Sequence, residues 1–407
     1  MKSVALNLTG LLAFLASGFV AVGQESGVES VKLSDSKKSP AAPAVDAAQK
    51  SSGTAPQPEA PVVQLALLLD TSGSMKGLID QAKTQLWGVV NEFITAKQAG
   101  KTPVVQVALY EYGKSSLKKE EHWVRQIQPL TRDLDKISEE LFALRTNGGE
   151  EYCGAVISAA AGSLDWDSSS KTYKAIFIAG NEPFTQGPVA SGGACKEAIT
   201  KGIIVNTIHC GPESEGVRTG WKDGALMADG SYMTIDQNQA VAHIDAPQDK
   251  EIVRLNEELN RTYVGWGVNA RGAAANQEAQ DSNAKGIAFS NLVSRARTKA
   301  SSNYFNASWD LVDACRAPDF KWDSIKKEDL PDDLKKLTTA ELKAHVDAQL
   351  ACRKDIQKKI LALTTERSTY VAAKRKELGE DLSLGNAVAG TVRKQAATKG
   401  VTFETGK

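Results

Sequence analysis

The sequence lacks an excess of either charge, and it has no long apolar segment after its first residues. Lysine plus arginine equals aspartate plus glutamate, at 49 each among the 407 residues. A general attraction to nucleic acid or to anionic lipid is therefore not expected. No segment after residue 23 is long and apolar enough to cross a bilayer. These absences predict a mature chain that is soluble and has no integral membrane span.

The sequence also lacks the motifs of common enzyme sites. Its only histidines are His122, His209, His243 and His345. None of them lies in a metalloprotease helix motif, and there is no Gly-x-Ser-x-Gly turn. A phosphate-binding glycine loop ending in Lys-Ser or Lys-Thr is absent as well. Because nothing assembles a nucleophile, a base and an oxyanion donor, we expect that the protein is not an enzyme.

The N-terminal residues have the pattern of an export signal. One lysine precedes an apolar run from Val4 to Val22, and Ala21 and Gly23 supply small residues before a cleavage point at Gln24. A retained membrane anchor is the alternative. Residues 24–60 are rich in Ser, Ala, Pro and Lys and have no aromatic residue, which predicts a disordered linker. We therefore predict a signal peptide at 1–23 and a periplasmic or extracellular protein.

Strand and helix patterns alternate between residues 61 and 240. Apolar runs predict strands, and the segments between them have helical spacing. The predicted strands are 62–70, 103–113, 121–130, 173–180, 202–211 and 231–236, and the predicted helices are 77–97, 131–144, 151–164, 191–201 and 219–228. This alternation predicts an α/β fold with a doubly wound, mostly parallel sheet covered on both faces.

The pattern from residue 248 to 407 is helical. Residues 265–286 are rich in Gly and Ala, and we predict that they are irregular. Residues 338–378 open with a capping box, Thr338 and Glu341, and continue as a long amphipathic helix. Its apolar side comprises Leu342, Val346, Leu350, Ile356, Ile360 and Leu363. We expect this side to pack against the sheet domain or against another chain.

Cysteine pairing is expected in an oxidising compartment. The cysteines are Cys153, Cys195, Cys210, Cys315 and Cys352. The last two are expected to join two helices of the C-terminal region. The first three are expected at one edge of the sheet, with one disulfide and one free thiol. A zinc site that includes His209 is disfavoured, because His209 and Cys210 are adjacent on a strand and point to opposite faces.

The stretch "LALLLDTSGSMKG", residues 65–77, places oxygen-bearing side chains where a buried strand ends. Asp70, Ser72 and Ser74 are spaced two apart on one turn. In open α/β sheets, ligands bind at the carboxyl ends of the strands. One carboxylate and two hydroxyls at this edge predict an ion-binding loop. The alternative is that Asp70 only caps the following helix or orders the turn.

With its strand before and its helix after, "DTSGSM" resembles the Asp-x-Ser-x-Ser motif of von Willebrand factor type A domains. The resemblance covers residues 61–240. It implies a metal-ion-dependent adhesion site, in which Asp70, Ser72 and Ser74 hold a divalent cation. Mg²⁺ is the expected ion, with Ca²⁺ or Mn²⁺ as alternatives. It also implies a protein or cell-surface partner that presents a carboxylate to the ion.

Two further loops of the family site differ in this sequence. Glu150, in "RTNGGEEYCG", stands where the family has a threonine, and Thr146 is an alternative for that place. Where the family has an aspartate, the sequence reads Gly180, Asn181, Glu182. The expected metal ligands are therefore Asp70, Ser72, Ser74, Glu150 and Glu182. Alternatively, Glu150 and Glu151 are acids of a first helical turn.

The resemblance favours an exported binding module that engages an acidic group of its partner through the ion. Two alternatives belong to other functional classes. One is a structural assembly protein that self-associates through helix 338–378. The other is a thiol or metal enzyme at the edge that holds Cys153, Cys195 and Cys210.

Overall fold

The computed structural model describes residues 60–236, 243–378 and 384–403. The predicted signal peptide, its anchor alternative and all but the last residue of the predicted linker lie outside these ranges. The strands are β1 (Val62–Asp70), β2 (Ala96–Gln98), β3 (Val104–Tyr112), β4 (Val124–Thr131), β5 (Tyr173–Gly180), β6 (Ile204–Cys210), β7 (Tyr232–Ile235) and β8 (Val401–Phe403). The helices are α1 (Lys76–Asn91), α2 (Leu134–Ala143), α3 (Cys153–Ser163), α4 (Ser191–Thr200), α5 (Glu213–Arg218), α6 (Trp221–Leu226), α7 (Asp249–Asn260), α8 (Ala270–Ile287), α9 (Phe289–Lys299), α10 (Leu311–Ala314), α11 (Thr339–Leu378) and α12 (Leu384–Ala397).

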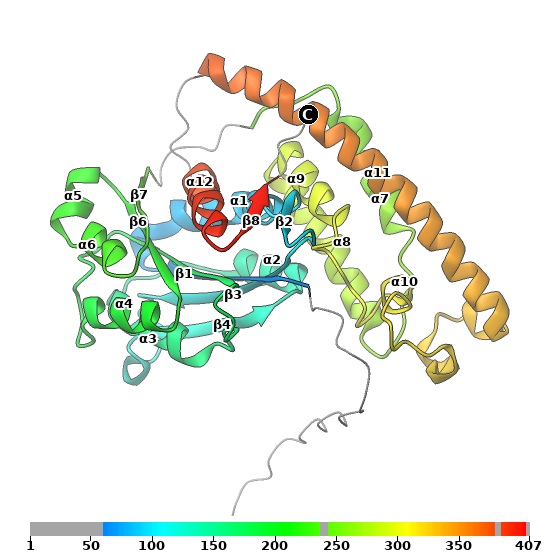
Figure 1. Cartoon of the computed structure of the whole chain (residues 1–407), viewed down its shortest axis with the longest axis horizontal. Helices are drawn as coiled ribbons and strands as arrows, with labels where there is room; N and C mark the ends of the chain where they lie inside the picture. Colours follow the sequence, from blue (N-terminus) through cyan, green and yellow to red (C-terminus); the bar gives the residue numbers. More distant parts are fainter. Residues whose placement is uncertain (1–59, 237–242, 379–383, 404–407) are drawn as a thin grey trace, which may run out of the picture. The chain divides into compact units, whose positions relative to one another are not determined.

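Six strands form one sheet in the order β4-β3-β1-β5-β6-β7 (Figure 1). All neighbouring pairs are parallel except β3 and β4, which are antiparallel. The chain moves from β1 to β3 on one side and later to β5 on the other side, so the order reverses beside β1. Such a reversal opens a crevice at the carboxyl ends of the strands. The predicted α/β fold class is confirmed, and β1 ends at this crevice.

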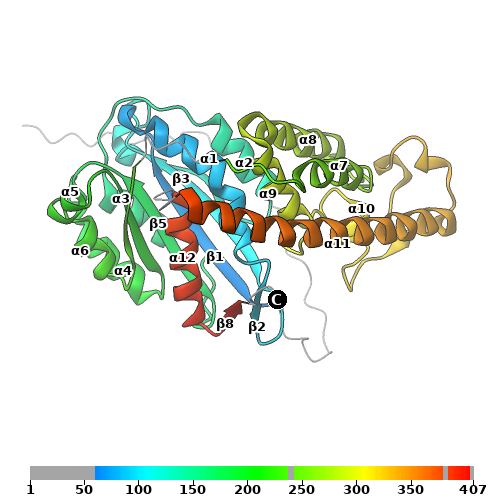
Figure 2. The same ribbon diagram turned by 90° about the horizontal axis from the view of Figure 1, so that it is seen from above.

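Alternate residues of β1 face different cores, as expected for a strand buried on both sides. Leu65 and Leu69 join a core under α1, α2 and α12, whereas Ala66 and Leu68 join a core under α3, α4 and α6. The continuous apolar run therefore reflects two covered faces. Figure 2 views the sheet from the face that α12 covers.

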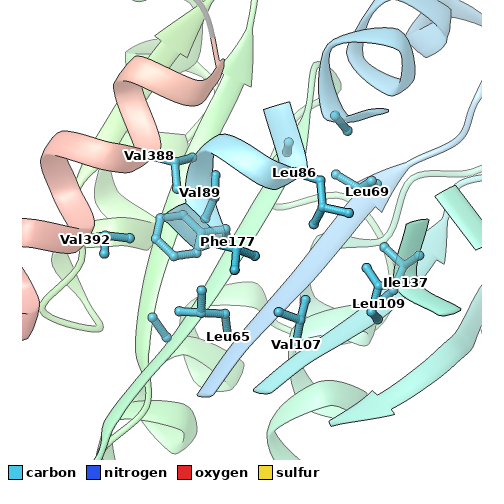
Figure 3. Packing of buried hydrophobic residues seen from close by; sticks show 14 of the residues in the cluster. Leu65, Leu69, Leu86, Val89, Val107, Leu109, Ile137, Phe177, Val388 and Val392 are labelled. Atoms are coloured by element: carbon cyan, nitrogen blue, oxygen red, sulfur yellow. The ribbon is translucent and has the colours of Figure 1, made fainter. Parts of the chain in front are cut away.

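The C-terminal helix α12 returns to the sheet and covers part of the face that α1 also covers. Val388 and Val392 of α12 pack beside Val89 of α1 and Phe177 of β5 (Figure 3). After α12, the short strand β8 pairs antiparallel with β2, which follows α1. Residues more than 200 positions apart thus complete one hydrophobic core.

Residues 265–286 were predicted to be irregular, and this prediction is wrong for most of them, because α8 spans Ala270–Ile287. Its buried residues include Gln277 and Gln280, so the segment has almost no apolar periodicity. Gln277 Nε2 donates to the Tyr304 hydroxyl (3.0 Å), and Gln280 Oε1 accepts from the Ser138 hydroxyl (2.8 Å). Alanine-rich composition favours the helix, and its buried side is fixed by the hydrogen bonds of the two glutamines together with an apolar contact of Ala284.

The predicted long helix is confirmed as α11, and its apolar side is buried within the chain. The capping box forms, since the Thr338 N–H donates to Glu341 Oε2 (2.8 Å). Val346 packs with residues of α10, and Ile360 packs with residues of α7 and α9. Because this stripe already has partners, self-association through it gains no support. Within the described ranges, no helix combines the length and the hydropathy needed to cross a membrane.

Candidate metal site at the end of β1

Asp70 lies at the end of β1, at the carboxyl edge of the sheet and between β3 and β5. Asp70 pairs in register with Tyr112, and the preceding Leu69 pairs with Ala179. The chain then turns through a short 3₁₀ segment, Gly73–Met75, into α1. The strand and the helix therefore fix both ends of the turn on which the predicted oxygen ligands lie.

The structure brings Asp70, Ser72 and Ser74 together. Asp70 is fully buried, Ser72 is 3 % exposed and Ser74 is exposed. The Ser72 N–H donates to Asp70 Oδ1 (2.7 Å), and the Ser72 and Ser74 hydroxyl oxygens are 3.4 Å apart. The three side chains thus lead from the interior to the surface along one turn.

The Asp70 carboxylate is only partly satisfied. Its Oδ2 is buried and has no hydrogen-bond partner in the described part of the chain. Burial raises the pKa of Asp70 to about 7, hydrogen bonds from Ser72 oppose that rise, and the nearby charge of Glu182 adds to it. A buried carboxylate oxygen without a donor is costly, and a cation would remove that cost. The oxygen-rich turn fits a hard divalent ion.

The loop before α3 contacts the Asp70 turn and the loop after β3 through its backbone. The Asn147 N–H donates to the Thr71 carbonyl oxygen (3.0 Å), and the Ser115 N–H donates to the Gly148 carbonyl oxygen (2.5 Å). Glu150 is exposed, and its Oε2 accepts a bond from Gln186 Nε2 (3.3 Å). Thr146, the alternative for the same place, is partly buried.

The neighbouring residue, Glu151, lies close to Asp70. Its side chain is 8 % exposed. A Cβ added to Gly113 would stand 2.8 Å from Glu151 Cγ and 2.9 Å from Asp70 Oδ1, so the two acidic side chains flank this glycine. Burial, followed by the charges of Asp70 and Glu182, raises the pKa of Glu151 to about 7. The sequence contains two adjacent glutamates but no signal that tells which of them faces the turn.

The loop after β5 lies on the other side of Asp70. A Cβ at Gly180 would be 3.1 Å from Asp70 Oδ2 and 2.5 Å from the Tyr112 hydroxyl, so only glycine fits there. Ser74 Oγ is 3.5 Å from Asn181 Oδ1, at the limit of a hydrogen bond. Glu182 is exposed, and its charge acts on Asp70 and Glu151. Its backbone is held by Trp221 Nε1, which donates to its carbonyl oxygen (2.9 Å).

Acidic groups alone do not form the site. Among the described residues, no three His, Cys, Asp or Glu side chains are arranged so that they could hold a metal ion by themselves. An ion at Asp70 would therefore need the serine hydroxyls and water as further ligands. Mg²⁺ commonly keeps several waters in protein sites.

The cysteines give no support to a thiol enzyme. All five lie in the described ranges, and the structure forms no disulfide among them. Cys210 belongs to the core under α1, whereas Cys153 and Cys195 belong to the core on the opposite sheet face. Burial raises the pKa of Cys195 to about 12 and raises the pKa of Cys153 and Cys210 as well. A nucleophilic thiol needs a lowered pKa.

No protein-family model and no curated protein matches the chain. Solved structures that are similar to part of it include the following three. BatB from Bacteroides thetaiotaomicron is 16% identical over 43% of this chain and 90% of its own, with a TM-score of 0.33. The VWA domain of SpRpn10 is 16% identical over 45% of this chain and 100% of its own, with a TM-score of 0.32. The vWF domain of the type V pili tip protein Mfa5 from Porphyromonas gingivalis is 12% identical over 43% of this chain and 90% of its own, with a TM-score of 0.32.

The fold is of the von Willebrand factor A type that the sequence resemblance implied. This assignment is based on the doubly wound sheet and on the Asp70 turn at the end of its first strand. The identities and TM-scores of the three similar structures are too low to bear on function.

Proposed function

We propose that the protein is an exported, divalent-cation-dependent binding module. Asp70, Ser72 and Ser74 hold the ion, and the ion engages a carboxylate of a protein or cell-surface partner. Mg²⁺ is the expected ion, with Ca²⁺ or Mn²⁺ as alternatives. The observation that carries the proposal is the Asp70 Oδ2 atom, which is buried without a hydrogen-bond donor at the crevice of the sheet.

The physical reason is the cost of a buried charge. A carboxylate taken out of water must be protonated, paired or bound to a metal. A divalent ion beside Oδ2 would compensate this charge, and the two hydroxyls would supply neutral oxygens. One charged and two neutral ligands leave coordination positions open. A partner carboxylate at one of these positions would complete the shell and carry further negative charge to the ion.

Glu182 and Glu150 have different parts in this proposal. Glu182 is exposed beside Asp70 and would tune the charge at the ion without being buried. Glu150 would reach the ion only after it leaves its contact with Gln186. The site proposed here binds a ligand, and no bond is made or broken in it.

Export is proposed from the N-terminal sequence alone. The apolar run from Val4 to Val22 and the small residues before Gln24 support a cleaved signal. The proposed location is the periplasm or the extracellular space.

The test is calorimetric titration of the whole chain with Mg²⁺ and with Ca²⁺. We expect the native chain to bind at least one ion, and Asp70→Ala to bind neither. Asp80→Ala is the matched control, because Asp80 is an exposed acid on α1 with only a long contact (3.9 Å) to Lys83. Failure of the native chain to bind either ion would overturn the proposal.

A further inference from the structure

Most buried carboxylates in the described part of the chain are paired with an arginine. The described part of the chain has seven of them, namely Asp70, Glu111, Asp135, Glu151, Asp249, Asp310 and Asp313. Five form an ion pair with an arginine. The two that lack an ion pair with any described residue are Asp70 and Glu151. The fold thus neutralises its buried acids at every described place except this one.

The two unpaired acids are neighbours. They flank Gly113, whose added Cβ would be 2.8 Å from Glu151 Cγ and 2.9 Å from Asp70 Oδ1. Ser72 interacts with both, since its N–H bonds Asp70 Oδ1 and its side chain favours the charged form of Glu151. Two buried carboxylates this close repel each other when both are charged. A positive group that touches both is missing from the described residues.

We propose that Glu151 is a ligand of the ion at Asp70, supplied by the chain itself. The inference rests on the proposed function and adds a second buried carboxylate to the ion site. A divalent cation next to both acids would balance two negative charges, as the arginines do for the other buried acids. Glu151 would take the position in the ligand set that the sequence resemblance gave to Glu150.

The adjacent glutamates provide a matched pair for the test. Glu151→Gln and Glu150→Gln remove the same charge from consecutive residues, one buried beside Asp70 and the other exposed. Calorimetric titration of the whole chain with Ca²⁺ and Mg²⁺ should show about tenfold or greater weakening for Glu151→Gln, since even outer-shell groups contribute about 10- to 100-fold. Glu150→Gln should change the affinity less than about twofold.

Thermal unfolding separates a ligand from a merely structural residue. In chelator, Glu151→Gln should be at least as stable as the native chain, because repulsion with Asp70 is removed. On addition of Ca²⁺, the native chain should gain more in Tm than the variant. If the glutamine variant has a non-native circular dichroism spectrum, Glu151→Ala replaces it in both measurements.

The outcomes distinguish this inference from the proposed function. Native-like ion affinity in Glu151→Gln overturns the role of Glu151 and leaves the ion site at Asp70 standing. A stability loss in chelator with an unchanged gain from Ca²⁺ also overturns it. Absence of ion binding in the native chain overturns the proposed function, and this inference falls with it.

Discussion

Gly113 shows how much the site depends on a single residue that carries no functional group. It follows β3 with a φ of +80°, a region that favours glycine. A methyl group there would meet the side chains of both Asp70 and Glu151 below 3 Å. The close approach of the two acids therefore requires glycine on steric as well as conformational grounds.

The prediction at this scale is that Gly113→Ala destabilises the protein and weakens ion binding. The cost of left-handed backbone strain and of the displaced acids is about 1–3 kcal/mol in the free energy of unfolding. Urea unfolding of the whole chain measures this change in the free energy of unfolding. Gly88→Ala is the control, because a methyl group at this helical position of α1 meets no atom within 4 Å. That change should be neutral or stabilise by up to about 1 kcal/mol; similar behaviour of the two variants would contradict the prediction.

At the scale of elements, buried ion pairs join α2, α8 and α9. Arg295 of α9 has no exposed surface and contacts Asp135 of α2 and Asp281 of α8, each at 2.5 Å. Lys299, one turn later, contacts Asp281 at 2.9 Å. Burial alone would raise the pKa of Asp281, but Lys299 and Arg295 outweigh burial and hold the pKa well below its usual range. Charge pairing thus positions the helical region against α2.

These ion pairs predict a loss of stability in acid. Because folding lowers the pKa of Asp281, the folded state binds fewer protons there than the unfolded state. The stabilisation is therefore complete above the usual pKa of about 4 and decreases as the pH falls below it. Urea unfolding between pH 7 and pH 2.5 should show this decrease.

Asp281→Asn should lose about 3–5 kcal/mol at pH 7, because Lys299 would lose the carboxylate it pairs with and Arg295 would keep only Asp135. The difference from the native chain should shrink as the pH falls. Asp332→Asn is the control, since Asp332 is 94 % exposed where it pairs with Lys335. A constant difference between Asp281→Asn and the native chain over the pH range would refute the explanation.

At the scale of the whole molecule, the last described residues complete the hydrophobic core on one face of the sheet that the first ones begin. Val388, Val392, Ala396 and Val401 belong to the core under α1. Gln395 of α12 also bonds buried groups of the sheet, since its Nε2 donates to Asn206 Oδ1 (2.6 Å) and its Oε1 accepts from the Tyr173 hydroxyl (2.8 Å). Removing α12 would uncover apolar and polar groups together.

A chain that ends at Leu378 should therefore be less stable than the whole chain. Burial of a large apolar side chain contributes about 1.5–3 kcal/mol, so the loss should be on the order of 5 kcal/mol. A lower urea midpoint of the shortened chain, and its binding of a hydrophobic dye, would show this loss of stability. A chain that ends at Phe403 is the control and should match the whole chain. Equal midpoints for all three chains would show that α12 does not stabilise the sheet.

Several features of the fold follow from local sequence. The apolar runs and their spacing predicted each strand of the main sheet and the helices α1, α2, α3, α4 and α6, because burial on both faces imposes a continuous apolar pattern. The short helix α5 was not predicted, and the predicted helix 77–97 is wrong at its end, where β2 begins at Ala96. The capping box of α11 and the Asp70 turn could also be predicted from the sequence, since their residues are close together in the chain. For α8 the pattern failed, because two of its three buried residues are glutamines and Ala284 alone gives no apolar periodicity.

What the sequence determined by itself was the order of these elements and the oxygen-bearing turn after β1. Tertiary structure decided which of Glu150 and Glu151 lies beside Asp70, because the path of a loop depends on its contacts with distant residues such as Gly113. It also decided that α12 covers the sheet and that Cys210 faces a different core from Cys153 and Cys195. These are contacts between distant parts of the chain, and local spacing does not determine which distant surfaces meet.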